Sequence, residues 1–69
     1  QGLYPAGIRE LKTAARLAPR STRVQVLLGE AYLNSGNSSA AATAFKRALQ
    51  LDPDNARARN GFNEASSRL

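Results

Sequence analysis

The sequence matches itself when it is shifted by 34 positions. Nine residues are then identical, whereas average residue usage gives about two or three identities by chance. The identical pairs are Gly2/Gly36, Ala6/Ala40, Lys12/Lys46, Ala14/Ala48, Leu17/Leu51, Pro19/Pro53, Arg23/Arg57, Glu30/Glu64 and Ala31/Ala65. A period of this length, divided into short helical units, is typical of a solenoid in which each unit buries its apolar face against its neighbour.

Prolines and a glycine divide the chain into segments of helical length. The breaks are Pro5, Pro19, Gly36 and Pro53, residue types that end or interrupt helices. Between the breaks, apolar residues recur at three- and four-residue spacing, which produces one apolar face on each helix. The sequence therefore predicts an all-α fold with each helix antiparallel to the next, over residues 5–17, 23–35, 38–51 and 54–68.

Helix-end signals support these boundaries. Thr22 followed by Gln25 is a capping-box pattern. Ser38 and Asp54 are typical N-terminal caps for the third and fourth helices. The run Asn34–Ser35–Gly36 is typical of the end of a helix.

The composition argues against catalysis. The 69-residue chain has no cysteine and no histidine, which removes disulfides, the usual zinc sites, thiol nucleophiles and histidine acid–base catalysis. Asp52 and Asp54 flank the proline of a turn, where a cap and a turn explain them. We therefore predict that the protein is not an enzyme and holds no metal or cofactor. The apolar runs are also too short to span a membrane.

The basic charge has no pattern that points to nucleic acid. A formal net charge of +5 permits an anionic partner. The ten basic residues are nevertheless scattered, and no aromatic residues are interleaved with them for base stacking. This distribution favours a solvated surface over a nucleic-acid interface.

A set of residues between positions 22 and 55 has the spacing of a known helical repeat. The set comprises Leu28, Gly29, Tyr32, Gly36, Ala41, Phe45, Ala48, Leu51, Asp52 and Pro53. Together they resemble the tetratricopeptide repeat, with one departure at Gln25, where the family often has a large aromatic residue. The resemblance implies a short right-handed solenoid of antiparallel helix–turn–helix units.

The sizes of these residues have a physical reason. Gly29 and Ala41 are small where two antiparallel helices must cross closely, and Tyr32 and Phe45 fill the space that the small residues leave. Gly61, by contrast, lies inside the last helix, where glycine costs about 1 kcal/mol relative to alanine.

The resemblance also implies an organisation of the whole chain as a single domain over residues 1–69. Residues 5–17 resemble the second helix of a preceding repeat, 22–55 a complete repeat, and 55–69 a C-terminal capping helix. Because the chain begins without methionine and without the first helix of that preceding repeat, we expect a truncated N-terminus. A polar final helix usually ends such arrays, so we also expect a natural C-terminus.

In tetratricopeptide proteins, ligands usually lie in a concave groove lined by the first helices. The corresponding residues are Arg23, Val26, Glu30, Leu33, Asn34, Arg57, Asn60, Glu64 and Arg68. The resemblance thus implies a non-catalytic module that binds a peptide or protein partner within a larger scaffold. It does not extend to the carboxylate clamp of some members, because Val26 and Glu30 stand where the clamp needs lysine and asparagine.

Two alternatives remain open. The apolar face of Ile8, Leu11 and Ala15 has no partner helix before it in this sequence, so chains could assemble into a homo-oligomer through exposed helix faces. An RNA-binding helical repeat is a second alternative, which the 34-residue period and the scattered charges disfavour.

Overall fold

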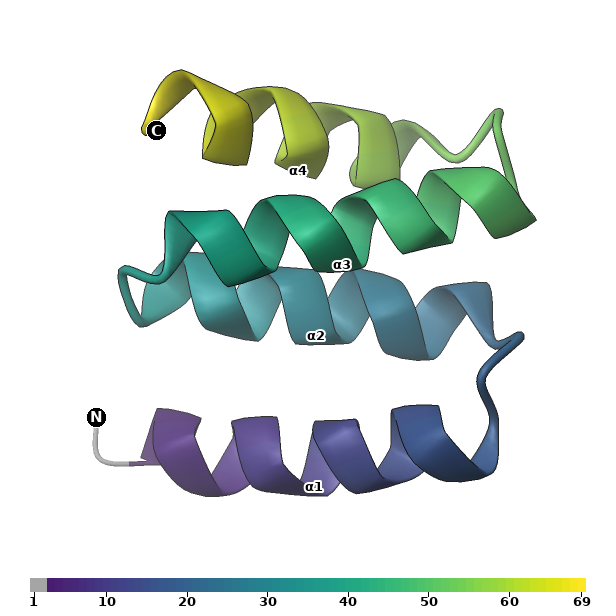
Figure 1. Cartoon of the computed structure of the whole chain (residues 1–69), viewed down its shortest axis with the longest axis vertical. Helices are drawn as coiled ribbons and strands as arrows, with labels where there is room; N and C mark the ends of the chain where they lie inside the picture. The colour runs from purple at the N-terminus through teal and green to yellow at the C-terminus, as the bar shows by residue number, and fades with distance from the viewer. Residues whose placement is uncertain (1–2) are drawn as a thin grey trace.

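The computed structural model describes residues 3–69, with side chains described from Gly7 onward. This part of the chain forms four helices: α1 (Leu3–Leu17), α2 (Thr22–Asn34), α3 (Ser38–Leu51) and α4 (Ala56–Ser67). Each helix runs antiparallel to the one before it (Figure 1), and residues 3–69 contain no strand. The predicted all-α fold of antiparallel helices is confirmed.

Three of the four helices have boundaries that differ slightly from the predicted ones. Helix α1 begins at Leu3 and not at Pro5. Proline is compatible with this start because an N–H in the first turn of a helix has no acceptor within that helix. Helix α2 begins and ends one residue earlier than expected, at Thr22 and Asn34. Helix α4 begins two residues later and ends one residue earlier than expected, at Ala56 and Ser67, whereas α3 spans the predicted residues 38–51.

The N-terminal caps are neighbours of the predicted ones. They are Ser21, which accepts from the Val24 N–H at 3.3 Å, Asn37, which accepts from Ala40 at 3.2 Å, and Asn55, which accepts from Ala58 at 2.9 Å. The predictions of Thr22, Ser38 and Asp54 as caps are therefore wrong. Thr22 and Ser38 already lie in the first turn of their helices, and Asp54 lies in the preceding turn, one residue too early to reach the free N–H groups.

The turn after α2 depends on a left-handed residue. Gly36 has a φ of 87°, a conformation that only glycine adopts without a steric penalty. It allows the chain to reverse, so that the Asn37 N–H donates to the Tyr32 carbonyl at 2.9 Å and the Gly36 N–H to that of Leu33 at 3.1 Å. The predicted helix end at this glycine is confirmed.

The core lies where α2, α3 and α4 meet. Phe45 of α3 is fully buried in it, and the other buried members are Val26, Leu33, Ala41, Ala42, Ala48, Ala58 and Ala65. Tyr32, Leu49 and Phe62 pack against this cluster and are partly buried. Because most of the core side chains are alanine, the helices must approach one another closely to exclude water.

Two glycines make room for the Phe45 ring. A Cβ atom added at Gly29 of α2 would lie 2.9 Å from three ring atoms, and one added at Gly61 of α4 would lie closer still. Real Cβ atoms do not approach a ring so closely. The predicted close crossing at Gly29 is thus present, and Gly61, which the sequence marks only as a helix-weakening residue, has a packing role that the sequence did not reveal.

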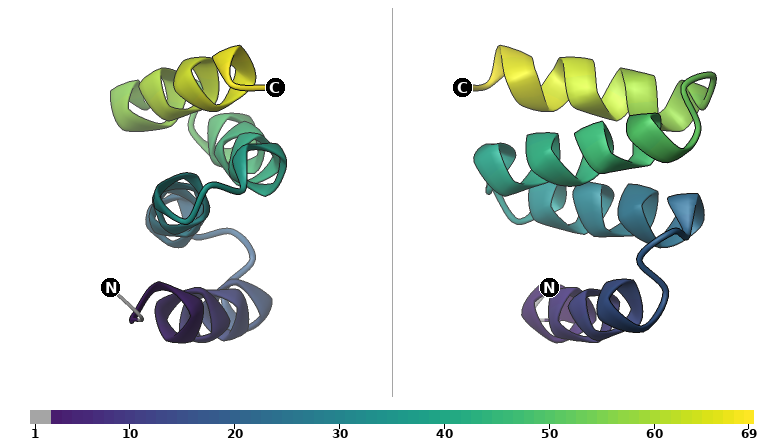
Figure 2. Two further views of the ribbon diagram at one scale, coloured as in Figure 1. Left: turned by 90° about the vertical axis from the view of Figure 1, so that its left-hand side faces the viewer. Right: turned by 45° about the vertical axis from the view of Figure 1, so that its right-hand side comes forward.

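Helix α1 packs against α2 alone among the described helices. Figure 2 shows it on the outer side of α2, away from α3 and α4. Its residues Ile8, Leu11 and Ala15 are half-buried, whereas Leu17 at its end is 81% exposed. The described residues therefore form a flat array with extents of 31 × 29 × 15 Å.

Candidate functional site

The predicted groove residues all lie on α2, α4 or the residue that caps α4, but they do not all reach the surface. Arg23, Asn34, Arg57, Asn60, Glu64 and Arg68 are exposed, and Glu30 is half-buried. Val26 and Leu33 are 4% and 9% exposed. They belong to the same core cluster as Ala58 and Ala65 of α4, because α4 packs directly on α2. Val26 and Leu33 therefore contribute little to the exposed surface of α2 and α4.

An ion pair joins the two helices across this surface. The Arg57 guanidinium donates to the Glu30 carboxylate with Nη2–Oε1 and Nη2–Oε2 distances of 2.7 and 2.8 Å and an Nε–Oε2 distance of 3.1 Å. Sequence spacing suggests that Glu30 shares a helix face with Arg23, and Arg57 with Glu64. The tertiary arrangement instead pairs Glu30 with Arg57, so each of these two charges already has a partner within the chain.

Within α4 and its cap, Glu64 and Arg68 form a second ion pair. The Arg68 Nη2 lies 2.6 Å from the Glu64 Oε2, as the spacing of four residues predicts. The side chains of Arg23, Asn34 and Asn60 make no hydrogen bond to any residue of the described chain. Among the predicted groove residues, these three side chains, one cation and two amides, are thus the ones that have no hydrogen-bond partner in the described chain.

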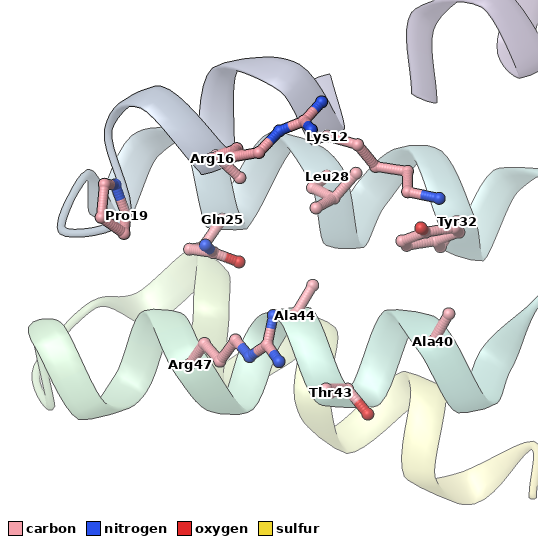
Figure 3. A pocket seen from close by; sticks show the side chains of 11 residues that line it. Lys12, Arg16, Pro19, Gln25, Leu28, Tyr32, Ala40, Thr43, Ala44 and Arg47 are labelled. Carbon is pink, nitrogen blue, oxygen red and sulfur yellow. The ribbon is translucent and has the colours of Figure 1, made fainter. Parts of the chain in front are cut away.

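A pocket of about 930 Å³ lies elsewhere, between α1, α2 and α3 (Figure 3). It shares no residue with the predicted groove. Gln25 of α2 lines it and is 4% exposed. The sequence marks Gln25 only as a departure from a repeat pattern, and no sequence signal connects it with the α1 and α3 residues of the pocket.

Comparison with known proteins assigns the chain to a family. The sequence pattern of the tetratricopeptide repeat matches residues 1–61. The chain belongs to the tetratricopeptide repeat family. Tetratricopeptide repeats are generally protein–protein interaction modules and are typically non-catalytic.

Individual relatives agree with this assignment. Superkiller protein 3 of Schizosaccharomyces pombe is 44% identical over 51 residues, and DnaJ homolog subfamily C member 7 of Homo sapiens is 32% identical over 66 residues. The mouse DnaJ homolog subfamily C member 7 gives the same values as the human protein. These alignments cover 74% and 96% of this chain but 4% and 13% of the relatives. The chain therefore spans a small part of the length of the proteins that it matches.

No group of three or more acidic side chains in residues 3–69 is arranged to hold a metal ion. None of the helices in this range is both long and apolar enough to cross a membrane.

Proposed function

We propose that this chain is a non-catalytic protein-interaction module that binds a peptide or protein segment along the surface formed by α2 and α4. The family supports a protein partner. The observation that carries the proposal is that Arg23, Asn34 and Asn60 project from α2 and α4 without a partner in the described chain. Such side chains are suited to a few polar contacts with an extended or helical peptide.

The proposal includes a specific organisation of the repeat. Residues 22–55 form one complete unit, residues 5–17 the second helix of the unit before it, and residues 55–69 a capping helix. The packing of α4 on both α2 and α3 supports this assignment, because the first helix of a following unit must contact both helices of the unit before it. The small share of the relatives that the chain covers supports its function within a larger scaffold.

A screen of a displayed peptide library tests the proposed surface. Peptides selected on the wild-type chain are labelled, and their affinity is measured by fluorescence polarisation for Arg23→Glu combined with Asn60→Ala. We expect a loss of about tenfold or more for the double variant, as for polar contacts at the centre of an interface. Lys46→Glu of α3 is the control, because Lys46 is exposed and lies outside the proposed surface. Equal affinity for all three proteins would reject the α2–α4 surface.

Self-association through α1 is a second candidate function. The observation that favours it is the exposure of Leu17, at the end of a helix that packs against α2 alone among the described helices. Because dimer stability depends on concentration, sedimentation velocity over a hundredfold dilution tests it. A concentration-dependent sedimentation coefficient that Leu17→Lys abolishes would support association, and a constant monomer value for both proteins would reject it.

A further inference from the structure

The pocket between α1, α2 and α3 lies on a different face of α2 from the proposed interaction surface. Gln25, Leu28 and Tyr32 of α2 line the pocket. They recur at three- and four-residue spacing, which places them on one face of the helix. Arg23 and Glu30 are rotated away from this face, since successive helical residues are about 100° apart. The pocket is therefore a separate site and not an extension of the α2–α4 surface.

Three cations, all of them exposed, line this pocket. Lys12 and Arg16 line it from α1 and Arg47 from α3, and no acidic residue is among its lining residues. Figure 3 shows Lys12 and Arg16 on the α1 side of the pocket and Arg47 on the α3 side, next to Ala44. Within the described chain none of the three forms a salt bridge. An anionic group bound between the walls would be attracted to all three charges.

The buried amide of Gln25 is a second, independent indication of which ligand the pocket binds. It is 4% exposed, and its Oε1 atom is fully buried without a hydrogen-bond partner in the described chain. A buried acceptor of this kind lacks the donor that water would otherwise provide. A primary amide has both a donor and an acceptor, and rotation about the terminal side-chain bond exchanges their positions. The group that complements it best is therefore another amide, such as the peptide group of a polypeptide.

The remaining walls suit a polypeptide backbone. Ala15 of α1 and Ala40 and Ala44 of α3 line the pocket with small side chains, and Leu28 adds an apolar surface. The volume of about 930 Å³ lies within the range of ordinary ligand pockets. A single half-buried aromatic ring, Tyr32, lines it, so the pocket lacks the row of stacking platforms that single-stranded nucleic acid requires.

We propose that this pocket binds an extended acidic peptide segment. An aspartate or glutamate carboxylate of the peptide lies among Lys12, Arg16 and Arg47, and a peptide group beside it pairs with the Gln25 amide. The site goes beyond the proposed function, because it would give the module a second peptide-binding face with its own charge preference.

Binding of defined probes tests the proposal. A fluorescein-labelled peptide containing consecutive Asp and Glu residues is compared with the same peptide carrying Asn and Gln, in buffer of about 150 mM salt, where non-specific attraction between exposed charges is partly screened. We expect the wild-type chain to bind the acidic peptide about tenfold or more tightly than the amide peptide, as for a charge-assisted contact. Equal affinity for both peptides would overturn the proposal.

A pair of adjacent residues on α3 provides a matched control. Arg47 and Lys46 are both exposed, so Arg47→Gln removes a charge that lines the pocket and Lys46→Gln removes an equal charge outside it. We expect Arg47→Gln to weaken binding of the acidic peptide about tenfold and Lys46→Gln to change it less than about twofold. Equal losses would show attraction to net charge and would overturn the site.

A third variant separates the amide from the charges. Gln25→Met keeps the length of the side chain and removes its polar atoms, so we expect weaker peptide binding with no loss of thermal stability. Unchanged affinity in folded Gln25→Met would overturn the role of the amide, and the Arg47→Gln comparison tests the site even if this variant fails to fold.

Two further measurements identify the occupant and the site. If a single-stranded oligonucleotide binds more tightly than the acidic peptide, and this binding depends on Arg47, the ligand of the pocket is nucleic acid and the peptide proposal is overturned. Arg23→Glu should leave binding of the acidic peptide unchanged, which distinguishes this site from the α2–α4 surface.

Discussion

The ring of Phe45 occupies the space that a side chain at Gly61 would need. Phe45 belongs to α3 and is fully buried, and Gly61 belongs to α4. The same ring also lies against Gly29 of α2, where an added Cβ atom would be 2.9 Å from it, so it cannot move freely away from α4. One aromatic side chain thus sets the spacing of three helices.

Replacing Gly61 with alanine is expected to destabilise the fold by about 1–2 kcal/mol. Overpacking of a core lowers the free energy of unfolding by about 1–3 kcal/mol, and the higher helix propensity of alanine offsets up to about 1 kcal/mol of this loss. Gly7→Ala in α1 is the matched control, because a Cβ atom there meets nothing within 4 Å and should raise stability by up to about 1 kcal/mol. Urea denaturation followed by circular dichroism measures both, and stabilisation by both substitutions would contradict the packing of Phe45 described above.

Gly36→Ala is expected to lower stability by about 1–2 kcal/mol for a different reason. The substitution places a Cβ atom at a φ of 87°, and the left-handed conformation costs an L-residue about 1–2 kcal/mol. Nothing lies within 4 Å of a Cβ atom at this position, so the loss would come from the backbone alone. Gly36→Asn should lose less than Gly36→Ala in the same denaturation measurement, because asparagine tolerates this conformation better. The reverse order would argue against backbone strain.

The cap of α4 can be assigned by comparing two adjacent residues. Asn55→Ala removes the oxygen that accepts from the Ala58 N–H and should cost about 0.5–2 kcal/mol. Asp54→Ala changes an exposed turn residue and should stay within about 0.5 kcal/mol of the wild type. Thermal melts of the two variants give the comparison. A larger loss for Asp54→Ala would restore the cap that the sequence predicted.

The ion pair between Glu30 and Arg57 is expected to contribute little to stability despite its short distances. The two side chains are 35% and 67% exposed, and exposed pairs of this kind contribute about 0.2–1 kcal/mol. A double-mutant cycle with Glu30→Gln and Arg57→Gln should give a coupling in this range that decreases at about 1 M salt. A coupling that is larger and insensitive to salt would indicate a desolvated pair.

The fold could be predicted because its signals are local or periodic. Pro19, Gly36 and Pro53 divide the helices, the apolar spacing identifies their buried faces, and the 34-residue period identifies the units that stack. Each of these depends on residues that are near in sequence or related by one fixed shift. The predicted N-terminal caps were each wrong by a single residue. Serine, threonine, asparagine and aspartate all have suitable side chains, and only backbone geometry selects among neighbouring residues of these types.

The candidate sites could be predicted only in part. The residues on α2 and α4 follow from the register of the repeat, but the burial of Val26 and Leu33 required the packing of α4 on α2. The pocket around Gln25 could not be predicted, since its lining comes from three helices whose spacing is set by side-chain volumes.

The sequence by itself determined the number, order and direction of the helices and the family of the chain. Only the tertiary structure decided that Gly61 is required by Phe45, that Arg57 reaches Glu30 and that the Gln25 carbonyl is buried without a donor. The physical reason is the distance along the chain over which each interaction acts. Helix formation depends on dihedral preferences and apolar spacing within a few turns, whereas each of these contacts depends on the distance between separate helices, which the packing of the whole core sets.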